Sequence, residues 1–576
     1  MPGRGSLCAR GTALFLVLGG GLTLPGFTAP RRNSARRPAP ARKAAAPAVN
    51  LDRPAPAAAR PAAAPLPATP PPGDRIMHIS EVKPGMKGYG LTVFRGTKIE
   101  RFNVEVVGVL PKQNLGQPLV LVRLSGGPIS ERAAYLIQGM SGSPIYIDGK
   151  LLGAFAYGNA WPKEPLGMVT PIEDMLEALD PKLPDTQAGQ LSLGEPLSRP
   201  NPAGADVSGV FRSPLEIPSV TAGAQTFRPL ALPVAVSGLS GRNLSRAAEI
   251  LAPFNMAVMQ GPGSMPEPIN ADLTPGAAMG VALMTGDVEM TGIGTVTYRK
   301  GDRILGFGHP MMQIGAAQFP LTTAFIHDVF PGFQSSFKIG SAGEICGTIN
   351  QDRPFGVAGR IGAAPPMVPI RCHIVDTGTG RSKTFNVKAA NHPMLVGQLL
   401  PLAVNQALQT VRPVPGDVVA YVSLTAETDG AGTIKRDNVF YDPAAIDVTA
   451  VRELQELMQI LSSNSFRRVP VKNLELEVKF EDKLPTATVE RIYLSQDKFE
   501  PGEDAEVGVV LRPYRKDPVV LKTKVHVPEN AANGQAILLV QGGATRVNLS
   551  AITQGGTPST LSAPPPDANL GQVLKR

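Results

Sequence analysis

The stretch Gly139-Met140-Ser141-Gly142-Ser143-Pro144 is the most informative part of this chain, because it places a serine in a loop between two expected strands. The apolar run 133–137 precedes it, and the strand Ile145-Tyr146-Ile147 follows it. Small residues let the backbone turn sharply and leave the N–H groups of Gly139 and Ser141 pointing into one pocket. Such a pocket can hold the oxyanion of a tetrahedral intermediate while Ser141 Oγ attacks a carbonyl carbon.

The residues behind this loop predict a β-hairpin. Two apolar runs, 145–147 and 150–152, are separated by Asp148-Gly149, a pair that is typical of a two-residue turn. A nucleophile elbow would instead need G-x-S-x-G followed by a helix, and Ser143 stands where its last glycine should be. The alternative is a Gly/Ser turn without chemistry, since a motif match is only a hypothesis.

Length and composition predict several β-rich domains. A chain of 576 residues is too long for one core, and about three domains are expected. The chain has 61 Gly and 58 Pro, and helix-length apolar periodicity is scarce. This combination favours strands joined by turns.

The net charge of +9 comes from the first 75 residues. They hold eleven Arg or Lys and two Asp, and eleven minus two is the whole excess. The remaining chain is neutral, so charge gives no reason to expect a nucleic-acid partner.

The N-terminus predicts export to the periplasm, the cell envelope or the medium. Arg4 and Arg10 precede an apolar run from Thr12 to about Ala29, which has the pattern of a signal peptide or a membrane anchor. Cleavage is favoured over retention, because the run is short for a membrane span. If it is retained, it is the segment that would associate with a membrane.

Composition and hydrophobic patterning predict eight segments. The first four are a signal peptide or anchor (1–29), a disordered Pro/Ala/Arg-rich spacer (30–75), a Ser-bearing β-barrel (76–182) and a linker with a small unassigned α/β segment (183–275). The last four are a His-bearing β-barrel (276–440), an amphipathic helical connector (441–468), a β-sandwich-like domain (469–545) and a disordered tail (546–576). Within the second barrel, 394–411 is helix-compatible, with Pro401 as an expected interruption. Leu474, Leu476, Val478 and Phe480 alternate with polar residues and are assigned to the sandwich.

A serine nucleophile needs a base, and His309 is the strongest candidate. It ends a second expected hairpin, 291–307, and lies between Gly308 and Pro310, where backbone can approach closely. The chain has six His, and a single His is more often structural than catalytic.

Three segments together resemble the stage IV sporulation protein B family of serine peptidases. They are Gly139–Ile145 with 148–153 behind it, Gly292–Thr297 running to Gly306-Phe307-Gly308-His309, and 347–349 to 355–359; the stretch 102–106 is a weaker match. The resemblance implies a trypsin-like double β-barrel with the site between the barrels. It also implies that Ser141 is the nucleophile and His309 the base.

The chain departs from the family pattern in two respects. The family has its His segment before its Ser segment, and here the order is reversed, so the barrels are expected in permuted order. Triads tolerate any chain order. The family also carries an acid shortly before the Ser motif, and the matching stretch 124–129 has none. Asp352 and Asp328, which follow the His motif, are the candidate orienting acids.

The sequence therefore favours an exported serine endopeptidase that performs limited proteolysis of a protein or peptide substrate. The catalytic residues would be Ser141 and His309, with the amides of Gly139 and Ser141 as the oxyanion hole, and no cofactor or metal is expected. The rival interpretation is an inactive homologue that acts as an envelope binding or scaffold protein; a secreted esterase is a third. Cys346 and Cys372 are expected as free thiols, although export would permit a disulfide.

Overall fold

The computed structural model describes residues 75–180 and 219–540, except 115, 160, 223–224, 264, 266–268, 270, 415, 465, 468, 483–485, 532–533, 535–537 and 539. The expected signal segment, nearly all of the spacer, the linker 183–218 and the tail lie outside these residues. The described residues are mainly β, with 52% in strands and 15% in helices. It forms two compact units, a large one that reaches Ala487 and a small one within 488–545.

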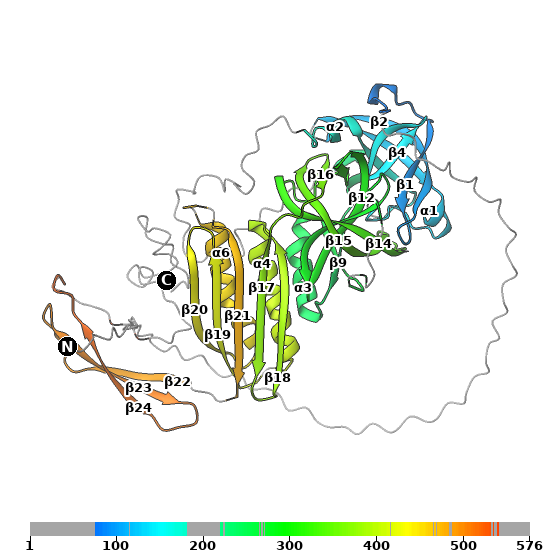
Figure 1. Cartoon of the computed structure of the whole chain (residues 1–576). Helices are drawn as coiled ribbons and strands as arrows, with labels where there is room; N and C mark the ends of the chain where they lie inside the picture. Colours follow the sequence, from blue (N-terminus) through cyan, green and yellow to red (C-terminus); the bar gives the residue numbers. More distant parts are fainter. Residues whose placement is uncertain are drawn as a thin grey trace, which may run out of the picture. The chain divides into compact units, whose positions relative to one another are not determined.

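The first barrel is a closed ring of six antiparallel strands (Figure 1). The strands are β1 (Lys87–Val93), β2 (Ile99–Asn114), β3 (Gln117–Ser125), β4 (Ser143–Ile147), β5 (Lys150–Gly158) and β6 (Leu166–Pro171). Their order is β4-β1-β2-β3-β6-β5, and a β4–β5 pairing closes the ring. The short strands β7 (Val220–Ala222) and β8 (Gln225–Pro229) extend the sheet from β5. Three short helices accompany it: η1 (Ile79–Glu81), α1 (Gly127–Glu131) and α2 (Ile172–Leu176).

Alternation and turn chemistry explain this barrel. On β2, Phe102, Val104 and Val106 are buried in the barrel core, as the period of two predicts. The β4–β5 hairpin turns at Asp148 (φ 50°) and Gly149 (φ 74°). Two successive positive φ values are what a type I′ turn requires, so the expected Asp-Gly hairpin is confirmed.

The second barrel is also a ring of six antiparallel strands. They are β11 (Ala278–Gly286), β12 (Glu289–Lys300), β13 (Arg303–Gly306), β14 (Gly315–Phe330), β15 (Phe337–Arg353) and β16 (Gly356–Ile361). The order β12-β13-β16-β15-β14-β11 closes through a β11–β12 pairing. Outside the ring, β9 (Leu232–Ser237) pairs with β12, and β10 (Met256–Gln260) runs parallel to β9 after α3 (Gly241–Leu251) and η3 (Ala252–Phe254). The double barrel expected from the sequence is therefore present.

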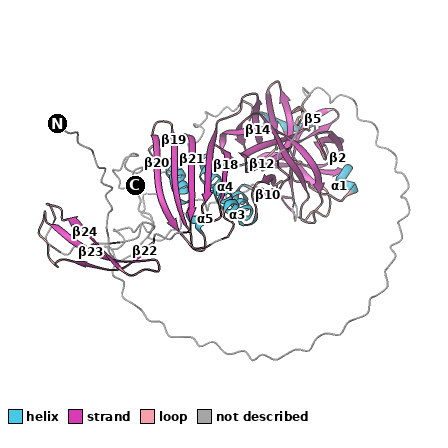
Figure 2. Ribbon diagram, turned by 60° about the horizontal axis from the view of Figure 1, so that its bottom comes forward, coloured by secondary structure: helices cyan, strands magenta, loops and turns pink. Residues whose placement is uncertain are grey.

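A helix-covered sheet follows the second barrel, where the sequence predicted continuation of the barrel to 440 (Figure 2). Its strands are β17 (Met367–Asp376), β18 (Arg381–Ala390), β19 (Val419–Thr428), β20 (Gly432–Tyr441) and β21 (Val471–Glu481), in the order β18-β17-β21-β19-β20. The helices α4 (Pro393–Val411), α5 (Ile446–Thr449) and α6 (Arg452–Ser463) accompany it. The apolar helix α4 packs on β17 and β18, which is the physical reason that this region forms a layered sheet instead of a barrel.

Two further expectations are revised here. The strand β21 pairs in parallel with β17 and antiparallel with β19, so Leu474, Leu476, Val478 and Phe480 belong to the large unit. Pro401 lies inside the continuous helix α4 and does not interrupt it. Packing of this buried helix on its neighbours offsets the loss of one backbone hydrogen bond.

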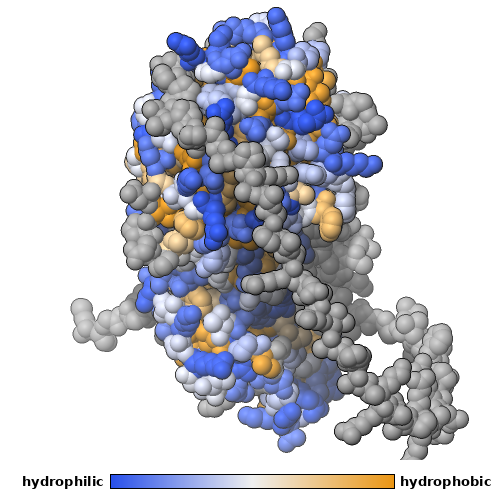
Figure 3. Space-filling model, turned by 90° about the vertical axis from the view of Figure 1, so that its right-hand side faces the viewer, coloured by the Kyte–Doolittle hydropathy of each residue, from blue (hydrophilic) through white to orange (hydrophobic). Residues whose placement is uncertain are grey.

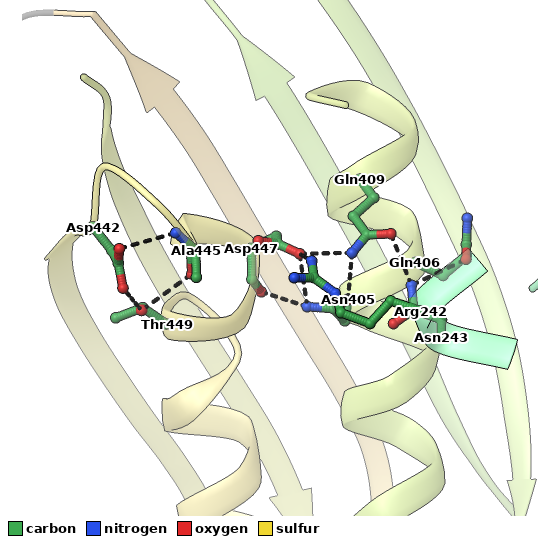
Figure 4. A network of polar contacts seen from close by, with 9 residues as sticks. All are labelled: Arg242, Asn243, Asn405, Gln406, Gln409, Asp442, Ala445, Asp447 and Thr449. Atoms are coloured by element: carbon green, nitrogen blue, oxygen red, sulfur yellow. Dashed lines mark hydrogen bonds and ion pairs between the residues drawn. The ribbon is translucent and has the colours of Figure 1, made fainter. Parts of the chain in front are cut away.

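A polar network joins α3, α4 and α5 on the helical side of this sheet (Figure 4). The carboxylate of Asp447 accepts hydrogen bonds from Gln409 Nε2 (2.7 Å) and Arg242 Nη2 (2.5 Å). Asn243 Nδ2 donates to Gln406 Oε1 over 3.0 Å. Because these polar groups hydrogen-bond one another, we infer that the network stabilises the packing of the three helices.

The small unit holds one described sheet. Its strands are β22 (Ala487–Leu494), β23 (Asp504–Pro513) and β24 (Val519–His526), with β23 in the middle. The sandwich-like domain expected over 469–545 is thus reduced, within the described residues, to three strands. Ala505, Val507 and Val509 of β23 are buried.

Among the described residues, no helix is both long and apolar enough to cross a membrane. Figure 3 shows one face of the chain, on which hydrophilic side chains separate smaller apolar areas.

Candidate active site

The serine loop lies between Gln138 and the start of β4, and two glycines shape it. Gly139 has φ 90° and Gly142 has φ 95°, values that side chains rarely allow. A Cβ on Gly142 would lie 2.0 Å from the carbonyl oxygen of Thr295. The loop therefore needs glycine at this position for two independent reasons, conformation and space.

Strand β12 of the second barrel fixes this loop. Thr295 donates its backbone N–H to Ser141 O (3.0 Å) and its hydroxyl to Gly139 O (3.0 Å). Thr297 Oγ1 donates to Gly142 O over 2.7 Å. Three carbonyl groups of the serine loop are thus bonded across the junction of the barrels.

The two expected oxyanion donors remain unengaged. Gly142 N–H donates to Phe155 O over 2.9 Å, but the N–H groups of Gly139 and Ser141 have no acceptor among the described residues. Free amides beside a serine hydroxyl are what an oxyanion hole offers a developing negative charge. The assignment of Gly139 and Ser141 to an oxyanion hole stays a prediction.

The histidine follows a strained turn at the end of β13. Phe307 has φ 69° and Gly308 has φ 72°, and positive φ is costly for a residue such as Phe307. Thr170 Oγ1 of β6 donates to Gly308 O over 2.6 Å. The first barrel therefore fixes the backbone just before His309, as the second barrel fixes the serine loop.

The two loops contact each other. A Cβ placed on Gly142 would lie 2.6 Å from the backbone nitrogen of Phe307, and one on Gly308 would lie 2.7 Å from Ala154 Cβ. Ala154 pairs with Pro144 in the β4–β5 hairpin. The segments that carry Ser141 and His309 are spatial neighbours, as a site between two barrels requires.

The reactive atoms are enclosed and unpaired. Ser141 is 0% exposed and His309 is 2% exposed. Neither Ser141 Oγ nor His309 Nε2 has a hydrogen-bond partner among the described residues. His309 Nδ1 lies 2.8 Å from Pro310 O, and a carbonyl only accepts, so Nδ1 carries the proton. Burial lowers the pKa of His309 to about 4, which leaves a neutral imidazole whose Nε2 can accept a proton.

Asp352 acts on the loop after His309 and not on the imidazole. Its carboxylate accepts the N–H groups of Met311 (2.8 Å) and Met312 (2.7 Å). Burial raises the pKa of Asp352 to about 6, although hydrogen bonds from the amides of 311–314 oppose the shift. Asp352 thus holds the backbone that follows His309.

Asp328, the other candidate acid, is engaged at the surface. Its Oδ1 accepts from Arg132 Nη1 over 2.8 Å, and that bond lowers the pKa of Asp328 below its usual value. The partner of His309 Nδ1 is the Pro310 carbonyl, so neither carboxylate bonds to the imidazole in this structure.

Several residues of the site were not found by reasoning from sequence. Thr170, Thr295 and Thr297 hold the two loops, and Lys338 is fully buried against Gly139. Thr295 and Thr297 lie in a segment predicted to be a strand, but a sequence does not show which carbonyl a strand threonine reaches. Cys346 and Cys372 are both free thiols.

Two closed six-stranded antiparallel barrels, with a serine loop and a histidine loop meeting at their junction, define the chymotrypsin-like class of fold. Residues 73–176 match the family SpoIVB peptidase S55. The match covers the barrel that carries Ser141 and ends before the barrel that carries His309. Comparisons with curated proteins and with solved structures found no match.

Proposed function

We propose that this protein is an exported serine endopeptidase that uses Ser141 as nucleophile and His309 as general base. One observation carries the proposal: Ser141 Oγ and His309 Nε2 are both buried and unbonded, on adjacent loops. Each of the two loops is held by a threonine of the opposite barrel, whose hydroxyl bonds a carbonyl of the loop. The match of residues 73–176 to SpoIVB peptidase S55 supports the same chemistry.

The proposed reaction follows the serine peptidase scheme. His309 Nε2 takes the proton of Ser141 Oγ as Oγ attacks the scissile carbonyl, and the amides of Gly139 and Ser141 bind the oxyanion. Nε2 then protonates the leaving amine, and water hydrolyses the acyl-enzyme. The bond from Nδ1 to Pro310 O keeps the proton off Nε2 in the resting state.

The carbonyl of Pro310 takes the position that a carboxylate holds in a full triad. A carbonyl orients the ring but does not carry the negative charge that stabilises an imidazolium. We therefore expect a Ser-His dyad with slow turnover, which suits limited cleavage of a protein substrate better than digestion. Export rests on the N-terminal apolar segment, and the protein substrate rests on the family resemblance.

Covalent labelling tests this proposal. The full chain is treated with diisopropyl fluorophosphate, chosen because it is small enough for an enclosed site, and the modified peptide is located by mass spectrometry. Wild type should gain one adduct on Ser141, whereas Ser141→Ala should gain none and His309→Gln should react far more slowly. An adduct on Ser143, or no adduct on a folded wild-type chain, would contradict the proposal.

A second candidate is an inactive homologue that serves as an envelope binding protein. The enclosure of Ser141 and the missing carboxylate partner of His309 favour it. This candidate predicts that Ser141 stays unmodified in a folded chain, and that Ser141→Ala leaves the function of the protein in cells unchanged.

A further inference from the structure

A fully buried lysine packs against the serine loop. Lys338 of β15 is 0% exposed. A Cβ on Gly139 would lie 3.2 Å from Lys338 Cδ and 3.3 Å from Lys338 Cβ, so the lysine stem lies directly over this glycine. Lysines are almost never buried in this way unless they are paired.

The backbone fastens this lysine to the loop as well. Lys338 N–H donates to Gln138 O over 3.0 Å, and Gln138 N–H donates to Ser336 O over 2.8 Å. The ammonium then crosses to the first barrel, where Lys338 Nζ donates to Thr92 Oγ1 over 2.8 Å. The lysine is therefore held at both ends, with Gly139 beneath its stem.

Among the described residues, no anion pairs with this ammonium. Its only hydrogen-bond partner among the described residues is the neutral, fully buried hydroxyl of Thr92. Burial lowers the pKa of Lys338 to about 7, and no charged neighbour contributes. An unpaired buried cation is costly unless a negative charge arrives beside it.

Among the described residues, no titratable group of the neighbouring elements pairs with Lys338. On β14, which pairs with β15 at Val329, His327 Nε2 bonds to Ser341 Oγ and Asp328 pairs with Arg132. The serine loop 139–143 has no acidic or basic residue. In the first barrel, β1 carries Lys87 and Tyr89, and the Arg101 guanidinium lies over the Tyr89 ring. Glu100 of β2 lies opposite Thr92. None of these groups shifts the lysine electrostatically.

We propose that Lys338 is an electrostatic residue of the serine site, whose ammonium stabilises the negative charge that forms at the Gly139 and Ser141 amides. This role rests on the proposed function. Two free N–H donors and one ammonium then lie at one loop, with no anion beside them among the described residues. A tetrahedral oxyanion is the ligand that would complete them.

The proposal is tested by the pH dependence of the rate at which diisopropyl fluorophosphate modifies Ser141. In wild type the rate should fall as pH rises through about 7, because Lys338 loses its charge. Lys338→Met keeps the length and removes the charge, and should lower the plateau by about 100-fold, the scale of one lost oxyanion donor. It should also abolish the fall near pH 7. Lys388→Met, which removes an exposed lysine of β18, should match wild type.

A second variant separates charge from packing. Thr92→Val removes the partner of the ammonium while keeping the side-chain shape, so the fall in rate should move to lower pH. A purely structural lysine would not produce this shift.

If Lys338→Met and Thr92→Val both give the wild-type profile, the lysine role is overturned and the peptidase proposal stands. If the folded wild-type chain forms no Ser141 adduct, both are overturned. A rate that rises through pH 7 in wild type, and not in Lys338→Met, would make Lys338 a base and contradict the electrostatic role.

Discussion

Thr295 and Ser141 belong to different barrels, and the backbone N–H of Thr295 donates to the carbonyl oxygen of Ser141 over 3.0 Å. The same residue bonds Gly139 O through its hydroxyl. One strand residue of the barrel that carries His309 thus sets the position of the nucleophile loop. The geometry of the site depends on the junction of the barrels and not on either barrel alone.

The first prediction concerns this contact. Thr295→Val should lower the free energy of unfolding by about 1–3 kcal/mol, because it leaves the buried Gly139 carbonyl without its hydroxyl donor. It should also slow modification of Ser141, since Gly139 becomes free to turn. Denaturant unfolding and the labelling rate measure the two effects. Thr348→Val is the control, because its hydroxyl bonds an exposed loop carbonyl, Ala363 O, and a loss as large as that of Thr295→Val would contradict the special role of Thr295.

The second prediction concerns Gly142. Gly142→Ala should destabilise the chain by about 2–5 kcal/mol, the sum of a left-handed conformation and a clash with Thr295 O. Gly149 has a similar φ of 74°, but open space lies where an added Cβ would be. Gly149→Ala should therefore lower the free energy of unfolding by only about 1–2 kcal/mol. Equal losses in urea unfolding would show that the close approach of the two barrels at Gly142 is absent.

The third prediction concerns Asp352. Its pKa lies above the ordinary value of 3.8, at about 6, because it is buried. The folded chain then holds this proton more tightly than the unfolded chain. Wild type should therefore lose stability relative to Asp352→Asn as pH rises from about 4 to about 6, by up to about 3 kcal/mol.

Urea unfolding of both chains at pH 4, 5, 6 and 7 measures this difference. Asp302→Asn, which changes an exposed carboxylate paired with Arg360, should follow wild type across the range. Asp352→Asn should in addition slow labelling of Ser141 at every pH, because an amide cannot accept the N–H groups of Met311 and Met312 with both of its ends. Curves for Asp352→Asn that stay parallel to wild type would show that this carboxylate is not buried.

The fourth prediction concerns the acid limb of reactivity. Since burial lowers the pKa of His309 to about 4, the labelling rate should rise between pH 3 and 5 and be flat just above. His309→Gln should remove this limb. In wild type the folded-state pKa of His309 lies below the ordinary 6.5. Wild type should therefore also lose stability relative to His309→Gln as pH falls from about 6.5 to about 4. An acid limb centred near 6.5 would indicate a solvated imidazole instead.

Local chemistry made much of the site predictable from sequence. Asp148-Gly149 specifies the β4–β5 turn, and both residues have the positive φ that the pair suggests. The glycines around Ser141 and His309 mark turns that only small residues allow, and those turns do meet. Alternation over 474–480 predicted a strand with one buried face, and β21 has that pattern.

Long-range pairing and buried partners could not be predicted in this way. The pattern of β21 fits any sheet with one buried face, and only the fold shows that it runs parallel to β17. Pro401 signals a break, but packing overrides the local preference. The partner of His309 Nδ1 is a neighbouring backbone carbonyl, which every residue possesses and no motif marks.

A crystal structure of the chain after reaction with diisopropyl fluorophosphate would show whether Ser141, His309 and the two amides form one active site. The phosphoryl group should be bonded to Ser141 Oγ, with its oxygen about 2.7–3.1 Å from the amides of Gly139 and Ser141, and with His309 Nε2 directed at the adduct. A phosphoryl oxygen that points away from both amides, or an adduct that His309 cannot reach, would contradict the account.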